Sequence, residues 1–106
     1  MTKISRRKLS NDSWSRFKKH FWQAVALIKS EVEAQQFFYD LLTPTEIKML
    51  SKRLEAAKLL VDGKSYDEIR KELCLGNSTI ANVSNWLEQG SGSLKRAAEH
   101  LSKFSK

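Results

Sequence analysis

The segment "GNSTIANVSNWLEQG", residues 76 to 90, contains three asparagines, two serines and a threonine but no lysine or arginine. An asparagine amide can bond N6 and N7 of adenine together, and a serine or threonine hydroxyl can bond a base or a phosphate. Ile80, Val83 and Leu87 recur at helical spacing, so most of the polar residues share the opposite face of a helix. The pattern predicts hydrogen bonding to the base edges of double-stranded DNA.

Residues suited to catalysis are scattered. His20 and His100 lie far apart, and the single Cys74 can make neither an intramolecular disulfide nor, alone, a zinc site. The sequence contains no glycine-rich phosphate loop. We therefore expect no catalytic residues, no metal, no cofactor and no enzymatic activity.

The net charge of the 106 residues is +7 at pH 7. This balance favours a polyanionic partner, with nucleic acid ahead of an anionic membrane surface. The sequence shows neither a signal-peptide core nor a run of about 20 apolar residues. We expect a cytoplasmic protein without a membrane segment, associated with the nucleoid through DNA.

Helix breakers lie between the apolar-periodic runs and not inside them. They are Pro44, Gly63, Gly76, Gly90 and Gly92. No run alternates with period two, so the prediction is an all-α fold of about six helices. We expect residues 1–11 to be a basic flexible arm and residues 12–104 to form one helical domain.

The expected first helix is capped by Asp12 or Ser13 and carries a broad aromatic stripe. That stripe contains Trp14, Phe17, Phe21 and Trp22. A second helix is expected from Val32 to Leu41. So much apolar surface on a small chain favours burial in a core or against a second copy over a cofactor site.

The motif "TPTE" predicts that Thr43 caps a third helix, with Pro44 in its first position and Glu46 reaching back to the cap. Gly63 should end this helix in the left-handed conformation. The expected buried face is Ile47, Leu50, Leu54, Ala57 and Val61.

Residues 65–89 read as a helix-turn-helix, two short helices joined by a tight turn. Ser65 and Glu68 form a second capping box. Cys74 occupies the turn position that usually prefers glycine. A left-handed conformation there would cost about 1 kcal/mol or more, which favours a turn of another shape.

Base reading is expected mainly from Asn82 and Ser78, and phosphate binding from backbone amides at the start of the second helix and from basic residues outside it. The full predicted DNA-binding set is Gly76, Asn77, Ser78, Thr79, Ala81, Asn82, Asn85, Lys52, Arg53, Lys64 and Arg70.

The segments "LTPTE", "KRLEAAKLLVDGKSYDEIRKEL" and "GNSTIANV" resemble the Trp repressor superfamily, over roughly Trp14 to Leu101. The resemblance implies an intertwined homodimer whose two recognition helices bind a palindromic operator. It also implies a ligand pocket that is incomplete here. Thr43 and Arg53 match two pocket positions, but Asn82 stands where the recognition-helix arginine should be, and Trp86 replaces a small serine.

We therefore expect Thr43, Arg53, Asn82 and Trp86 to be the remnant of this pocket. The pocket itself is expected to be absent or to be filled by the Trp86 indole. An ordinary core or interface role for Trp86 is the alternative. Arg53 would contact a phosphate or pair with Glu46, Asp67 or Glu68. The identity of any small-molecule effector stays open.

The sequence as a whole predicts a sequence-specific regulator of transcription, a repressor by occlusion that does not depend on tryptophan. Three alternatives stay open: a helical protein–protein adaptor, a nonspecific architectural DNA-binding protein, and a tryptophan-activated repressor. A weaker fourth is a membrane-surface role for the basic, aromatic first helix.

Overall fold

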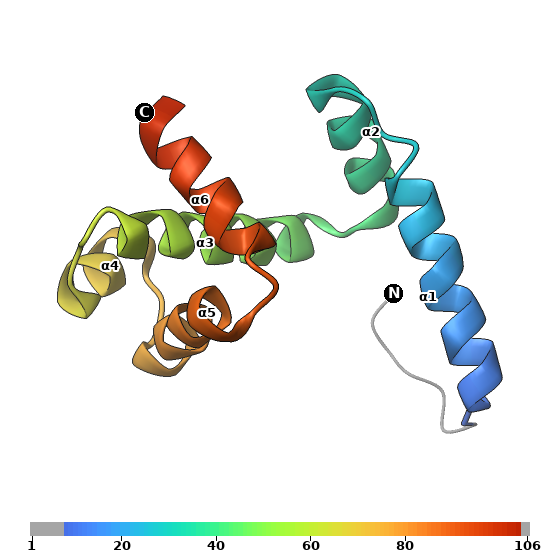
Figure 1. Ribbon diagram of the computed structural model, residues 1–106, viewed down its shortest axis with the longest axis horizontal. Coiled ribbons are helices and arrows are strands. Elements are labelled where there is room, and N and C mark those ends of the chain that lie inside the picture. Colours follow the sequence, from blue (N-terminus) through green and yellow to red (C-terminus); the bar gives the residue numbers. More distant parts are fainter. Residues whose placement is uncertain (1–7, 105–106) are drawn as a thin grey trace. The chain divides into compact units, whose positions relative to one another are not determined.

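The computed structural model describes residues 8–104, and these form six α-helices and no strand (Figure 1). The helices are α1 (Asn11–Val25), α2 (Glu31–Leu41), α3 (Pro44–Val61), α4 (Tyr66–Leu73), α5 (Asn77–Gln89) and α6 (Ser93–Phe104). The prediction of an all-α fold with about six helices is confirmed. Most of the predicted basic arm, residues 1–7, lies outside the described residues.

The cap of α1 differs from the prediction. Ser10, in extended conformation, accepts a hydrogen bond on its hydroxyl from the Ser13 N–H at 3.1 Å. The predicted caps, Asp12 and Ser13, lie instead inside the first turn, where the Asp12 carboxylate favours the positive end of the helix dipole. The helix therefore starts slightly earlier because Ser10 provides the required spacing to the third helical residue.

The chain divides into two compact units, Met1–Leu41 and Leu42–Lys106. In the first unit, neither α1 nor α2 contains a buried residue. Trp14 is 47% exposed and Trp22 63% exposed, although aromatic neighbours touch edge to face along α1. The aromatic stripe predicted on α1 is therefore surface in the isolated chain.

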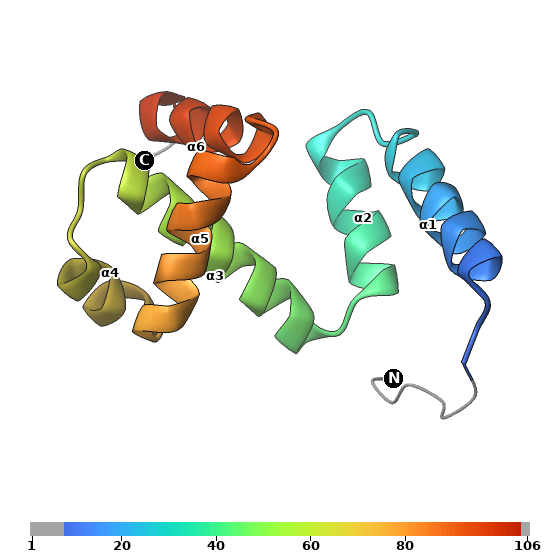
Figure 2. The ribbon, with the colours of Figure 1, turned by 60° about the horizontal axis from the view of Figure 1, so that its bottom comes forward.

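In the second unit, α3 is the central helix and packs against α4, α5 and α6. Figure 1 shows α6 crossing α3, and Figure 2 shows α5 running across α3 beside α4. The core is small and comes from all four helices. It consists of Ala56, Ala57, Leu59, Ile69, Ile80, Val83 and Ala98.

The predicted buried face of α3 was wrong in part. Leu50 and Leu54 are 48% and 36% exposed, whereas Ala56 and Leu59 are buried. Ala57 is buried as predicted. Helical periodicity could not separate these neighbouring faces, since both are apolar. Alanine side chains let other helices approach α3 closely, and this close approach fixes which face is covered.

The start of α3 follows the prediction. The Glu46 N–H donates to Thr43 Oγ1 at 3.1 Å, and the Thr43 N–H donates to Glu46 Oε1 at 2.8 Å. The N–H donated by Thr43 stabilises the ionised carboxylate and lowers the pKa of Glu46 below its ordinary value. This capping box fixes where α3 begins.

The end of α3 is joined to α6. Gly63 has a φ of +86°, the left-handed conformation predicted after this helix. Beside it, the Ser102 hydroxyl of α6 donates a hydrogen bond to the Asp62 carboxylate. That bond, followed by the neighbouring Lys58, lowers the pKa of Asp62. A side-chain contact between distant parts of the sequence thus holds α6 against the end of α3.

Candidate nucleic-acid interface

Helix α4 begins at a second capping box. The Glu68 N–H donates to Ser65 Oγ at 3.1 Å, and the Ser65 N–H donates to Glu68 Oε1 at 2.8 Å. The donated Ser65 N–H lowers the pKa of Glu68. Ile69 is fully buried and attaches α4 to the core. This end of the candidate interface is therefore set by a local signal and one apolar anchor.

The turn between α4 and α5 contains a left-handed residue. Cys74 has φ 55° and ψ 46°, and its N–H donates to the Arg70 carbonyl at 2.9 Å. The expectation of a turn of another shape was therefore wrong: the turn takes the form that glycine would prefer, with a cysteine in it. The bond to Arg70 closes the last turn of α4 and helps hold this conformation.

Helix α5 turns Ile80 and Val83 to the core and most of its polar residues outward. Ile80 and Val83 are fully buried. The predicted contact residues Asn77, Ser78, Ala81, Asn82 and Asn85 are all exposed, and Thr79 is half-buried. The amphipathic division predicted for this helix is present at these residues, and Trp86 and Glu88 are exposed beside them.

The start of α5 leaves backbone donors without a side-chain cap. Gly76 precedes the helix and has no side chain that could accept a hydrogen bond. The first-turn N–H groups, which begin at Asn77, therefore lack a partner from the cap residue. Such a helix start attracts anions through its N–H groups and its dipole.

The predicted phosphate contacts lie on α3, α4 and the loop between them. Lys64 is exposed and Lys52 is half-buried. The Arg70 guanidinium is paired with Asp67 in the same helix. Exposed pairs of this kind contribute only a few tenths of a kcal/mol, so Arg70 could exchange Asp67 for a phosphate at little cost.

Arg53 and Trp86 come together between α3 and α5. The Arg53 guanidinium carbon lies 6.0 Å from the centre of the Trp86 ring, in the geometry of a cation–π contact. The ion pair of Arg53 with Glu46, Asp67 or Glu68, one of the two predicted alternatives, is not formed within residues 8–104. These acids have other partners: two close capping boxes and one binds Arg70.

Trp86 is 44% exposed in the single chain, so its ring covers Arg53 without entering the core. Thr43 is occupied by its capping role, and Asn82 points to solvent. The structure thus brings two of the four pocket-remnant residues into contact, Arg53 and Trp86.

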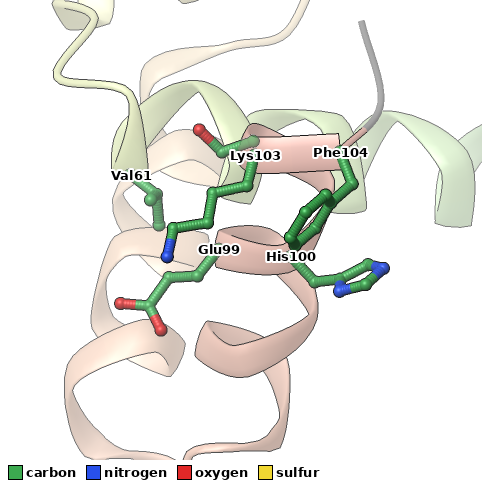
Figure 3. A pocket seen from close by; sticks show the side chains of 6 residues that line it. Val61, Glu99, His100, Lys103 and Phe104 are labelled. Atoms are coloured by element: carbon green, nitrogen blue, oxygen red, sulfur yellow. The ribbon is translucent and has the colours of Figure 1, made fainter.

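A separate hollow lies near the ends of α3 and α6, with a volume of about 450 Å³. Figure 3 shows its lining side chains, which are Val61, Glu99, His100, Ser102, Lys103 and Phe104. None of the predicted contact residues lines it. Within the described part of the chain, no three metal-ligating side chains cluster, and no helix is both long and apolar enough to span a bilayer.

Residues 17–102 match the family of Trp repressor proteins. The chain belongs to the Trp repressor family. The uncharacterized protein YerC of Bacillus subtilis is 31% identical over 80 residues, which are 76% of this chain and 77% of that one.

Two solved structures are also similar. A TrpR-like protein from Eubacterium eligens is 31% identical with a TM-score of 0.76, covering 92% of this chain and 100% of its own. A candidate Trp repressor from Staphylococcus aureus is 29% identical with a TM-score of 0.72, covering 81% and 86% of the two chains.

The Trp repressor family is one of DNA-binding regulators and not of enzymes, which agrees with the helix-turn-helix formed by α4 and α5. One outward residue was missed in the sequence: Gln89, at the end of α5, is exposed on the same side as Asn82 and Asn85. Its helical spacing from Asn82 could have revealed it.

Proposed function

We propose that the protein is a homodimeric, sequence-specific regulator that binds double-stranded DNA through residues 65–89 and represses by occlusion. The observation that carries the proposal is that the predicted contact residues exposed on α5, Ser78, Ala81, Asn82 and Asn85, are small and uncharged in a chain of net charge +7. Such a helix fits the major groove without repelling phosphates. DNA binding would place the protein in the cytoplasm at the nucleoid.

The proposed roles divide between the elements. Asn82 and Ser78 contact bases, with Ala81 and Asn85 beside them. The set that binds phosphate consists of the amides of Gly76 to Ser78, the hydroxyl of Thr79, and the side chains of Lys52, Arg53, Lys64 and Arg70. Phosphate contacts add affinity without sequence information, whereas base contacts specify the site.

The homodimer is proposed because unit 1 has an apolar surface and no core. Trp22 is 63% exposed and Tyr39 65% exposed, a poor arrangement for an isolated chain in water. A second copy would cover these helices and make residues 12–104 one domain. Two α5 helices related by a dyad would then reach major grooves about 34 Å apart, which requires a palindromic operator.

We propose further that DNA binding does not need tryptophan. The contact between Arg53 and Trp86 supports this, because the guanidinium already has an aromatic partner on α5. An exposed cation–π contact contributes about 0.5–1 kcal/mol to holding α5 on α3. Titration with millimolar L-tryptophan should therefore give no calorimetric isotherm, and a clear isotherm would refute this part.

The main test is selection of bound duplexes from a random library, with and without L-tryptophan. A dyad-symmetric motif enriched equally in both conditions supports the proposal. Enrichment only with tryptophan would identify a tryptophan-activated repressor. If no motif is enriched, salt-dependent binding to any duplex would indicate an architectural protein. Complete lack of DNA binding would favour a protein–protein adaptor.

A second test separates the proposed roles. Asn82→Ala should relax base preference at one position of each half-site. Lys52→Ala should weaken binding to every sequence alike and reduce the salt dependence by about one phosphate contact per chain. The reverse pattern would show that the roles of these two residues were assigned wrongly.

A further inference from the structure

The side of α5 that could meet a base is fixed by the side that α5 buries. Ile80 and Val83 are both 0% exposed, and with about 3.6 residues per turn the opposite side of the helix follows directly. Exposed residues at steps of three or four form a row there, which we call the neutral stripe. It consists of Ser78, Asn82, Asn85 and Gln89.

The neutral stripe carries carboxamides and a hydroxyl, without a formal charge. An asparagine or glutamine amide has an NH₂ group that can donate to the N7 of adenine and a carbonyl oxygen that can accept from its N6 amino group in the major groove. Guanine presents two acceptors at this edge, and arginine or lysine reads them best. Helix α5 has neither residue, and its one charged side chain is Glu88 in the last turn.

Ala81 lies on the exposed side of α5 next to Asn82 in the sequence. A methyl group at this place can contact the C5 methyl of thymine, which only an adenine–thymine pair offers. Two neighbouring side chains of different chemistry, an amide and a methyl group, thus favour the same kind of base pair.

We infer that α5 selects adenine–thymine pairs, with Asn82 bound to N6 and N7 of an adenine and Ala81 against a thymine methyl on an adjacent pair. No guanine is read from this helix. The inference rests on the proposed function, since it specifies what the proposed DNA-binding surface recognises. It also separates sequence reading from charge, because the basic residues of the interface lie outside α5.

The test uses the enriched operator with single base analogues. 7-Deazaadenine lacks the N7 acceptor. At the adenine bound by Asn82 in one half-site, it should weaken binding about three- to tenfold, the range expected for one hydrogen bond. Replacing thymine by uracil, which lacks the methyl group, should weaken binding less at the adjacent pair. 7-Deazaguanine should have no effect. Affinity is measured by fluorescence anisotropy at one salt concentration.

A protein variant completes the cycle. Asn82→Ala should bind the natural operator about tenfold or more weakly than the wild type does. The variant should bind the operator with 7-deazaadenine as well as it binds the natural operator, because it already lacks the amide that bonds N7. Asn11→Ala makes the same chemical change at the exposed start of α1 and serves as the matched control, with unchanged selectivity.

Two results would overturn the inference while leaving the proposed function intact. One is a dyad-symmetric operator whose binding is weakened by 7-deazaguanine but not by 7-deazaadenine. The other is an Asn82→Ala variant that still loses affinity on 7-deazaadenine as the wild type does. Failure to enrich any operator would instead refute the proposed function itself.

Discussion

Cys74 provides a direct test of the turn in the helix-turn-helix. Within residues 8–104 it is the one residue other than glycine with positive φ, at φ 55° and ψ 46°. This conformation costs an L-residue roughly 1–2 kcal/mol, whereas glycine adopts it freely but loses an extra 0.5–1 kcal/mol or so of backbone entropy on folding. Cys74 is exposed, so removing its thiol sacrifices little burial. We expect Cys74→Gly to stabilise the fold by about 0.5–1 kcal/mol.

The experiment compares Cys74→Gly with Cys74→Ala and with the wild type, by urea and thermal unfolding at one protein concentration, since association shifts the apparent stability. Alanine removes the thiol but keeps the backbone cost, so Cys74→Ala should remain near the wild type. Cys74→Gly should unfold about 3 °C or more above both. A glycine variant no more stable than the alanine variant would show that the turn is not left-handed.

Further tests concern two glycines and the capping box of α4. In Gly90→Ala the new Cβ would lie 2.6 Å from the Trp86 carbonyl oxygen, so we expect a loss of about 1–3 kcal/mol in urea unfolding. Gly76→Ala, whose Cβ would meet nothing within 4 Å, should cost less, and equal losses would contradict the close approach. Ser65→Ala should cost about 0.5–2 kcal/mol by removing the cap of α4, and an unchanged midpoint would argue against this capping box. The folded-state pKa of Glu68 is lowered, so its stabilisation is present above its ordinary pKa of 4.5 and is lost as the pH falls through the lower folded value. Stability measured against pH should be flatter in this window for Glu68→Gln than for the wild type, and a parallel profile would contradict the argument.

The features that sequence predicted best are those set by residues close together in the chain. Thr43 with Glu46, and Ser65 with Glu68, each form a capping box within one turn, and both boxes are present. The outward face of α5 was also correct, because Ile80 and Val83 fix it by spacing alone. Local chemistry leaves few alternatives at such places.

The errors involve choices between neighbouring candidates or contacts between distant ones. Asp12 or Ser13 was predicted to cap α1, where the structure has Ser10, and periodicity could not rank two neighbouring apolar faces on α3. The contact of Arg53 with Trp86 joins two helices, as does the hydrogen bond from Ser102 to Asp62. Neither contact can be predicted from a short sequence motif. At Cys74 the left-handed conformation was predicted to be unfavourable, and the turn was therefore expected to have another shape. The turn is left-handed all the same, since packing of α4 and α5 can outweigh about 1 kcal/mol.

The position of the charges has a consequence for how the proposed regulator could change specificity. The neutral stripe and Ala81 on α5 make the proposed base contacts, while Lys52, Lys64 and Arg70 lie on other elements. Substitutions in the stripe would therefore alter the preferred operator with little effect on the general attraction to DNA, because phosphate contacts supply most of that attraction. Conversely, loss of one lysine would weaken every site and preserve the order of preference. Such a regulator can acquire a new operator through one or two substitutions between uncharged residues, because its phosphate contacts, and with them most of its affinity for DNA, stay unchanged.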